Sequence, residues 1–255
     1  MKNILLLMKS ITIKIPVAIG TALITLVTMS LQPAKAAILA LDSSLDLEAT
    51  ADAGGELVTD TDFDSQGNTI NPLNASVSAF AAFGTASVLS QAKASASWLN
   101  TSQGQVVFSD VGWETSNVSS GEATLFNGTD WTYTFFADTD GIFTLDYDVS
   151  ASTDTTNDFG LNGFNFIWSG FEGNTFFGLN SSGTLTRTIT AGDTFTVNIN
   201  NQANIFGGLS TRQASMDGNF TWKIQTATVP EPSSILGILA LGALGASLTK
   251  KHKLN

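Results

Sequence analysis

The residues that most often carry enzymatic chemistry are scarce in this 255-residue chain. It contains no cysteine, and its single histidine, His252, lies among the last four residues. Upstream of that tail, the sequence excludes Ser–His–Asp and Cys–His catalysis and zinc sites built on imidazole or thiolate. It also excludes disulfides. Carboxylates remain as the candidates for chemistry.

One carboxylate pair has the spacing of a possible glycosidase pair. Asp146 and Asp148 are two residues apart on an expected strand, so they share a face, and that face is opposite Leu145 and Tyr147. A glycosidase needs one carboxylic acid whose pKa is raised, usually by burial. We therefore expect a solvated sheet face here, and no enzymatic activity.

Three other carboxylates suggest metal binding. The spacing Asp60-Thr61-Asp62-Phe63-Asp64 places alternating carboxylates in what reads as a polar loop. Carboxylate oxygens are the ligands that calcium prefers. The segment is no EF-hand, because the glycine and glutamate that such a loop requires are missing. Calcium, bound by Asp60, Asp62 and Asp64, is the one cofactor that the sequence suggests.

The five tryptophans divide into two groups. Trp131, Trp168 and Trp222 are in phase with apolar faces of expected strands, which predicts that they are buried. Trp98 ends an alanine-rich strand, and Trp113 lies in a turn-like stretch. We expect these two side chains to be exposed and, in a lectin-like protein, to stack on sugar rings.

The segment 37–229 is strongly acidic. It holds 21 acidic residues and four basic ones, Lys93, Arg187, Arg212 and Lys223, which gives a formal net charge of −17. Binding to a phosphate backbone requires lysine and arginine in quantity. Nucleic acid is therefore excluded as a partner, while solubility outside the cell is favoured.

Period-two alternation of apolar and polar residues predicts strands throughout this segment. The clearest runs are 131–138, 143–150, 164–168, 195–199 and 219–224. The first two are joined by Asp138-Thr139-Asp140-Gly141 and read as a hairpin with one apolar face. Turn residues recur every ten positions or so. The expected fold is all-β, an antiparallel β-sandwich that is jelly-roll-like.

Two regions are less clearly patterned. In 75–98, alanine favours a helix, but alanine and serine alternate strictly from Gln91 to Trp98, so we expect a strand. In 37–64, we expect one or two strands, around 38–41 and 45–49, followed by the polar loop.

The first 36 residues have the features of a secretory signal peptide. Lys2, Lys9 and Lys14 form a positive region, 15–31 is almost entirely apolar, and Ala34-Lys35-Ala36 is a small-x-small cleavage site. Signal peptidase is therefore an expected partner, with Ala34 and Ala36 at the cut. Because the segment is long, translation from Met8 in place of Met1 is an alternative start.

The C-terminal segment 230–255 joins three signals in a fixed order. Pro230-Glu231-Pro232 is extended, because proline fixes φ and removes backbone donors. An uncharged apolar run, Ile235 to Leu248, follows and is just long enough to span a bilayer as a helix. Lys250-Lys251-His252-Lys253 would then stay on the cytoplasmic side.

This arrangement resembles the PEP-CTERM protein-sorting signal of Gram-negative bacteria, including cyanobacteria. The resemblance rests on Val229 to Ser233, on the glycine-containing apolar run, and on the basic end. It implies that exosortase recognises Pro230, Glu231 and Pro232 and removes the tail. The protein would be held transiently in the inner membrane and then delivered to the cell surface or the extracellular space. The alternative is an ordinary C-terminal membrane anchor.

The sequence thus predicts a signal peptide (1–36), an extracellular β-sandwich (37–229) and a sorting segment (230–255). We expect a non-enzymatic protein with a structural or adhesive role in biofilm or extracellular polysaccharide. The alternative is a carbohydrate-binding module that recognises this polysaccharide, and a third hypothesis is a hydrolase that uses carboxylates alone.

Overall fold

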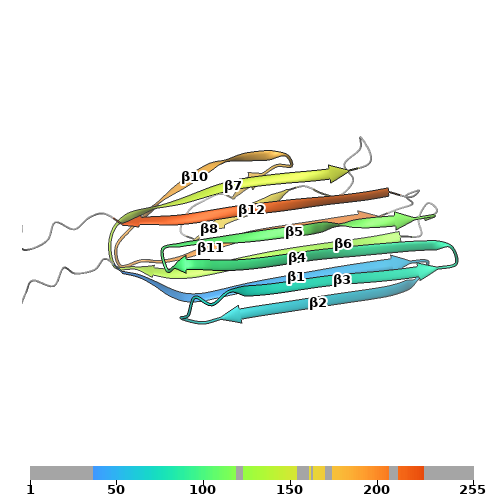
Figure 1. Ribbon diagram of the computed structural model, residues 1–255, viewed down its shortest axis with the longest axis horizontal. Helices are drawn as coiled ribbons and strands as arrows, with labels where there is room; N and C mark the ends of the chain where they lie inside the picture. The colour runs from blue at the N-terminus through green and yellow to red at the C-terminus, as the bar shows by residue number, and fades with distance from the viewer. Residues whose placement is uncertain are drawn as a thin grey trace, which may run out of the picture. The chain divides into compact units, whose positions relative to one another are not determined.

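A computed structural model describes residues 37–118, 123–153, 161, 163–169, 174–206 and 212–226. Within these ranges, the alternating pattern of the sequence forms long antiparallel strands (Figure 1). The strands are β1 (Ile38–Ala53), β2 (Glu56–Gln66), β3 (Leu73–Phe83), β4 (Ala86–Asn100), β5 (Gln103–Ser116), β6 (Ala123–Ala137), β7 (Gly141–Thr153), β8 (Phe164–Trp168), β9 (Thr175–Phe177), β10 (Ser181–Ile189), β11 (Thr194–Phe206) and β12 (Arg212–Thr226).

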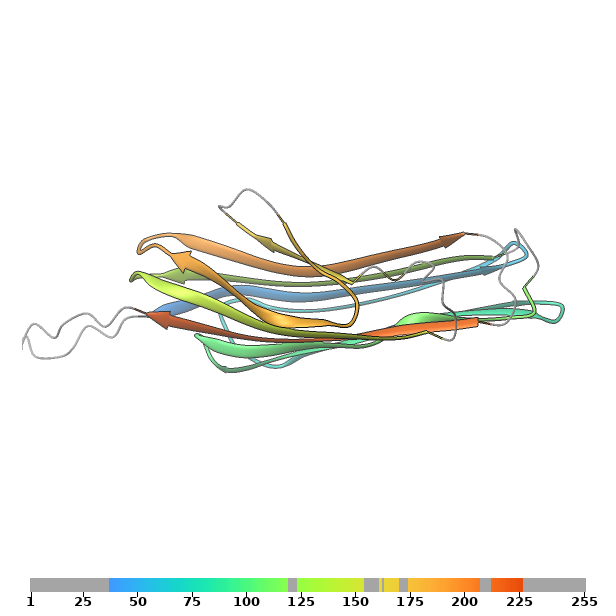
Figure 2. The same cartoon turned by 90° about the horizontal axis from the view of Figure 1, so that it is seen from above.

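The strands form two six-stranded sheets that pack as a sandwich (Figure 2). Sheet A has the order β2-β1-β6-β11-β8-β9, and sheet B has the order β10-β7-β12-β5-β4-β3. Every pairing between neighbours is antiparallel. The predicted antiparallel β-sandwich is confirmed.

The core between the sheets has two differently built sides. On the alanine-rich side, β1, β3 and β4 turn mostly small residues inward, namely Ala49, Ala51, Ala53, Ala75, Ala79, Ala81, Ala92, Ala94 and Ala96. On the aromatic-rich side, the buried residues are mainly rings, among them Phe108, Trp131, Tyr133, Phe135, Phe143, Phe164, Phe166, Trp168, Phe177, Phe220 and Trp222. The expected burial of Trp131, Trp168 and Trp222 is confirmed.

The strand prediction for 75–98 is also confirmed. β3 and β4 form a hairpin whose turn contains Gly84 at φ +63°, a backbone conformation that glycine adopts without strain. The alanines of β4 point inward, and Lys93 points to solvent. Alternation thus decides the structure here, and the helix propensity of alanine does not.

The predicted hairpin between 131 and 150 is wrong. β6 lies in sheet A and β7 lies in sheet B, so residues 138–140 cross from one sheet to the other. Alternation shows that both strands have an apolar face, but it cannot distinguish a strand that pairs with its neighbour from one that faces it across the core.

In 37–64, one strand forms where one or two were expected: β1 is continuous, with a bulge between Ala40 and Asp42. The polar loop expected after it is wrong, because Glu56–Gln66 form β2. β1 begins and β12 ends at the same end of the sandwich (Figure 1). Ile38 of β1 is opposite Ala137, the last residue of β6, and Thr226 of β12 is opposite Gly141, the first residue of β7. Only residues 138–140 separate these two partners.

Candidate functional site

The three carboxylates predicted to bind calcium form a ladder between the two sheets. Asp60, Asp62 and Asp64 lie on β2, the edge strand of sheet A, and face β3, the edge strand of sheet B. Their Oδ2 atoms accept hydrogen bonds from the backbone N–H groups of Ser78, Ser76 and Asn74, at 2.7, 2.8 and 2.9 Å. These amides are on the side of β3 that no strand of the described residues covers, so the ladder satisfies an exposed sheet edge.

The expectation of a calcium-binding loop is therefore wrong in its geometry. Asp60, Asp62 and Asp64 are spaced along a strand, and each carboxylate reaches a different amide. Among the described residues, no group of three or more acidic, histidine or cysteine side chains could hold a metal ion. The carboxylates of Asp138 and Asp140, in the segment between β6 and β7, likewise accept backbone hydrogen bonds, from Ala37 and Ala191.

Neither Trp98 nor Trp113 is the exposed aromatic that the sequence suggested. Trp113 is 6% exposed and points inward, and Trp98 is half-buried, with its ring 5.9 Å from that of Tyr133. Trp113 was assigned to a turn-like stretch, but β5 continues through it. A bulge at Asp110, with φ at +53°, shifts the alternation of β5 by one residue and directs Trp113 into the core. Stacking of these two side chains on a sugar ring is no longer supported.

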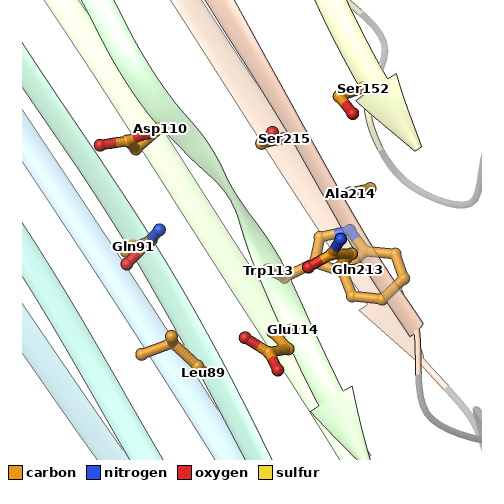
Figure 3. Close-up of a pocket in the computed structure, with 9 residues that line it drawn as sticks. All are labelled: Leu89, Gln91, Asp110, Trp113, Glu114, Ser152, Gln213, Ala214 and Ser215. Carbon is orange, nitrogen blue, oxygen red and sulfur yellow. The ribbon is translucent and has the colours of Figure 1, made fainter. Parts of the chain in front are cut away.

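A small hollow lies on sheet B beside Trp113 (Figure 3). Gln91, Gly112, Ser215 and Ser152 are cross-strand neighbours in one row. Gly112 has no side chain, which leaves a gap at its position in the row. A Cβ atom at Gly112 would lie 2.2 Å from the carbonyl oxygen of Ala214, so only glycine fits. The hollow measures about 150 Å³, which is below the ~300 Å³ of ordinary ligand sites.

The larger concave surface lies on the outer face of sheet A. There the strand registers place Asp46 of β1 opposite Asp130 of β6, Asp130 opposite Asn200 of β11, and Asn200 opposite Asn165 of β8. Antiparallel partners in one row project on the same side of the sheet. Four polar side chains from four strands thus form one line across the sheet, and Phe176 of β9 extends it.

Hydrogen bonds connect most of this line. Asn165 donates to Asn200 at 3.3 Å, Asn200 donates to Asn198, and Asn198 donates to Asp130 at 2.6 Å. Thr132 donates to the same carboxylate oxygen at 3.2 Å. The side chains are therefore held in defined positions before any ligand binds, which lowers the entropic cost of binding.

Asp130 is the titratable group whose behaviour is altered here. Burial raises its pKa above the ordinary value, and the negative charge of Asp46 acts in the same direction. The hydrogen bonds from Thr132 and Asn198 lower the pKa, but the effect of burial is larger. The folded structure therefore destabilises the charged form of Asp130 relative to its neutral form.

Two adjoining hollows follow this row. One, of about 350 Å³, is lined by Asp46, Glu48, Phe126, Gly128, Thr129, Asp130, Asn200, Asn201 and Gln202. The other, of about 680 Å³, is lined by Leu161, Gly163, Asn165, Phe176, Gly178, Leu179, Asn200, Asn201 and Gln202. Because both include Asn200, Asn201 and Gln202 of β11, they form one depression, which we call the cross-strand groove.

The cross-strand groove combines polar groups with aromatic rings. Phe126 is half-buried beside Gly128, and Phe176 is 54% exposed on β9. Thr129 and Asn201, which lie next to Asp130 and Asn200 in their strands, are buried and turn their side chains toward the core. The groups that the groove offers to a ligand are therefore those of the outward-facing row.

The segment 194–202 carries a sequence signal for this site, although sequence reasoning missed it. Its apolar residues predict the buried face of β11, and the residues between them, Thr196, Asn198, Asn200 and Gln202, are all polar and capable of hydrogen bonding. What the sequence cannot supply is the register that aligns them with Asp46 and Asp130.

The carboxylate pair on β7 is not part of the groove. Asp146 lies on the exposed outer face of this strand, as expected, and accepts a hydrogen bond from Thr184.

The predicted sorting and cleavage residues, Pro230, Glu231, Pro232, Ala34 and Ala36, lie outside the described residues, as does the expected membrane helix. Within the described ranges, no helix has the length and apolar character needed to span a bilayer.

Comparison with known proteins identifies the C-terminus. The family model described as the PEP-CTERM protein-sorting motif matches residues 228–251. No curated protein and no solved structure matches the chain. The C-terminal resemblance is confirmed, and the motif implies an exported protein that exosortase processes and that is sorted to the cell surface.

Proposed function

We propose that the PEP-CTERM sorting signal displays a non-enzymatic β-sandwich at the cell surface, where the sandwich has a structural or adhesive role. The observation that carries this proposal is the match of residues 228–251 to the sorting motif, directly after the last strand. A protein delivered to the surface by such a signal is available to neighbouring cells and to extracellular polymers.

The composition of the sandwich supports this role. The segment 37–229 has a formal net charge of −17 and no histidine or cysteine, so the commonest catalytic side chains are missing. Much of its acidic character lies on strand faces, where Asp60, Asp62 and Asp64 bind backbone amides. Removal of the inner-membrane tail would leave the acidic domain soluble outside the cell.

Processing is tested by replacing Pro230, Glu231 and Pro232 with alanine in the native host. We expect the triple variant to stay in the membrane fraction with its tail attached, as intact mass would reveal. Thr228→Ser is the matched control and should be processed normally. Unaltered processing and release of the triple variant would contradict exosortase sorting through this motif, and would favour a simple anchor.

The adhesive role needs a separate test. Cells that lack the protein should retain less extracellular polysaccharide and attach less firmly to a surface than cells that produce it. The triple-alanine variant should fail to restore attachment, because it is not delivered. Normal attachment of the deletion strain, with wild-type protein present at the surface of the parent strain, would contradict this role.

A further inference from the structure

We infer that the cross-strand groove of sheet A binds a neutral polysaccharide chain laid across the strands. This inference rests on the proposed surface display, because it gives the adhesive role its ligand. It assigns binding to Asp46, Asp130, Asn200 and Asn165, in place of the tryptophans and loop carboxylates that the sequence suggested.

The shape of the groove favours a polymer. The row that lines it runs over β1, β6, β11, β8 and β9, and four spacings of ~4.8 Å between neighbouring strands give a length of roughly 19 Å. Its two hollows measure about 350 and 680 Å³, and they meet over β11. A linear chain fills such a depression, whereas a single small molecule occupies only one part.

The chemistry of the lining favours sugar hydroxyls. Carboxylate and amide side chains offer planar groups with two hydrogen-bonding atoms, which match pairs of neighbouring hydroxyl groups. Asn165, Asn200 and Asn198 are already linked into one network that ends on Asp130. The rings of Phe126 and Phe176 supply apolar surface for the C–H faces of sugar units.

The charge of the groove decides which polysaccharide. Asp46, Glu48 and Asp130 are acidic, and none of the described residues that line the two hollows is basic. An acidic polymer would be repelled, since like charges disfavour the complex. A cationic peptide would be attracted to the exposed carboxylates of Asp46 and Glu48, and polylysine tests for such a partner. The half-buried carboxylate of Asp130 is already engaged by Asn198 and Thr132, and the amides of the row can bind neutral hydroxyl groups without any charge on the ligand.

Affinity electrophoresis tests the inference with the processed protein recovered from the native host. Hydroxyethylcellulose, dextran and galactomannan are the neutral probes, alginate is the acidic probe, and polylysine is the cationic probe. We expect at least one neutral polymer to retard the protein and alginate to leave it unaffected. Lack of retardation by all three neutral polymers, or retardation by alginate or polylysine alone, would overturn the inference.

Variants locate the binding site. Asn200→Ala should weaken retardation about tenfold, because one or two hydrogen bonds are lost, and Gln202→Ala, a more exposed change in the same groove, should weaken it less. Gln91→Ala removes an amide from the outer face of sheet B and should bind as the wild type does. Unchanged binding by both groove variants would place the site elsewhere.

Two further readouts separate this inference from its premises. Intact mass shows whether the groove variants are still sorted and lose their tails. A variant that is sorted but no longer retarded supports the groove, and normal processing of the triple-alanine variant would count against the proposed function alone. Formation of new reducing ends during incubation would overturn a purely binding role, because it would show that the chain is hydrolysed.

Discussion

On the alanine-rich side of the core the two sheets are linked by hydrogen bonds, whereas on the aromatic-rich side they are linked by rings. Ser90 of β4 donates to the carbonyl oxygen of Phe126 at 2.8 Å, and Asn127 of β6 donates to that of Gln91. On the other side, Tyr133 of sheet A stacks on Trp222 of sheet B, with centroids 4.9 Å apart.

The difference follows from side-chain volume. Small inward residues let the sheets approach until Cα atoms of β1 and β3 lie within 8 Å of each other, closer than the ~10 Å typical of packed sheets. At that separation a short serine or aspartate reaches the opposite backbone. Bulky rings such as those of Trp222 and Tyr133 fill the space between the sheets on the other side. There the contact is mainly between rings, with one hydrogen bond from the Tyr133 hydroxyl to the carbonyl oxygen of Thr101 at 2.9 Å.

The largest effect is expected from removing a ring on the aromatic-rich side. Trp222→Ala should lower the free energy of unfolding by about 3–5 kcal/mol, because a fully buried indole leaves a cavity. Urea denaturation followed by circular dichroism measures the change. Lys223→Ala, on the exposed face of the same strand, is the control. A loss below about 1 kcal/mol, the usual effect of a point mutation, would show that the rings are not what holds this side together.

A large residue on the alanine-rich side should also destabilise the fold. Ala79→Leu places three extra carbon atoms between sheets that are already close, which should cost about 1–3 kcal/mol. Ala82→Leu makes the same change on the exposed side of β3, and its unfolding curve should overlay that of the wild type. Equal stability of the two variants would mean that the sheets can separate without cost.

Removing one carboxylate from the ladder should have a smaller effect on the free energy of unfolding. Asp62→Ala leaves the N–H group of Ser76 without its acceptor and should cost about 1 kcal/mol, since water replaces part of the bond. Hydrogen exchange of the Ser76 amide should accelerate as well. Thr61→Ala, which changes an exposed neighbour on β2, should alter neither quantity.

The smallest effect concerns pH and Asp130. Burial raises its pKa in the folded state, so its contribution to stability is complete below the ordinary value of 3.8 and is lost as pH rises through the raised value. Asp130→Asn should therefore raise the thermal midpoint near pH 7, and the gain should shrink as the pH falls toward the ordinary pKa of 3.8. Asp146→Asn controls for net charge. An equally large gain in acid would contradict this account.

The sequence predicted what depends on local alternation. The strand character of 75–98 and the burial of Trp131, Trp168 and Trp222 follow from period two, because each strand has one face in the core. Trp113 was misplaced because the sequence around it reads as a turn, whereas β5 continues through this stretch after the bulge at Asp110.

The candidate site could not be predicted from local alternation either, because it depends on how the strands pair. Asp46, Asp130, Asn200 and Asn165 come from four strands that are distant in sequence, and they align only through register. The carboxylate ladder likewise depends on β2 and β3 being consecutive in sequence but members of different sheets. Local pattern fixes which face a residue occupies, and sheet order decides which residues it meets there.

The backbone nitrogen of Ala37 donates to Asp138 Oδ1 at 2.7 Å, where β1 begins beside the crossing from β6 to β7. If signal peptidase cuts after Ala36, this nitrogen changes from an uncharged amide into an ammonium group. The same contact then becomes a charge-assisted hydrogen bond, which is the stronger kind. Maturation would thus fasten the first strand of the sandwich in the step that frees it from its leader.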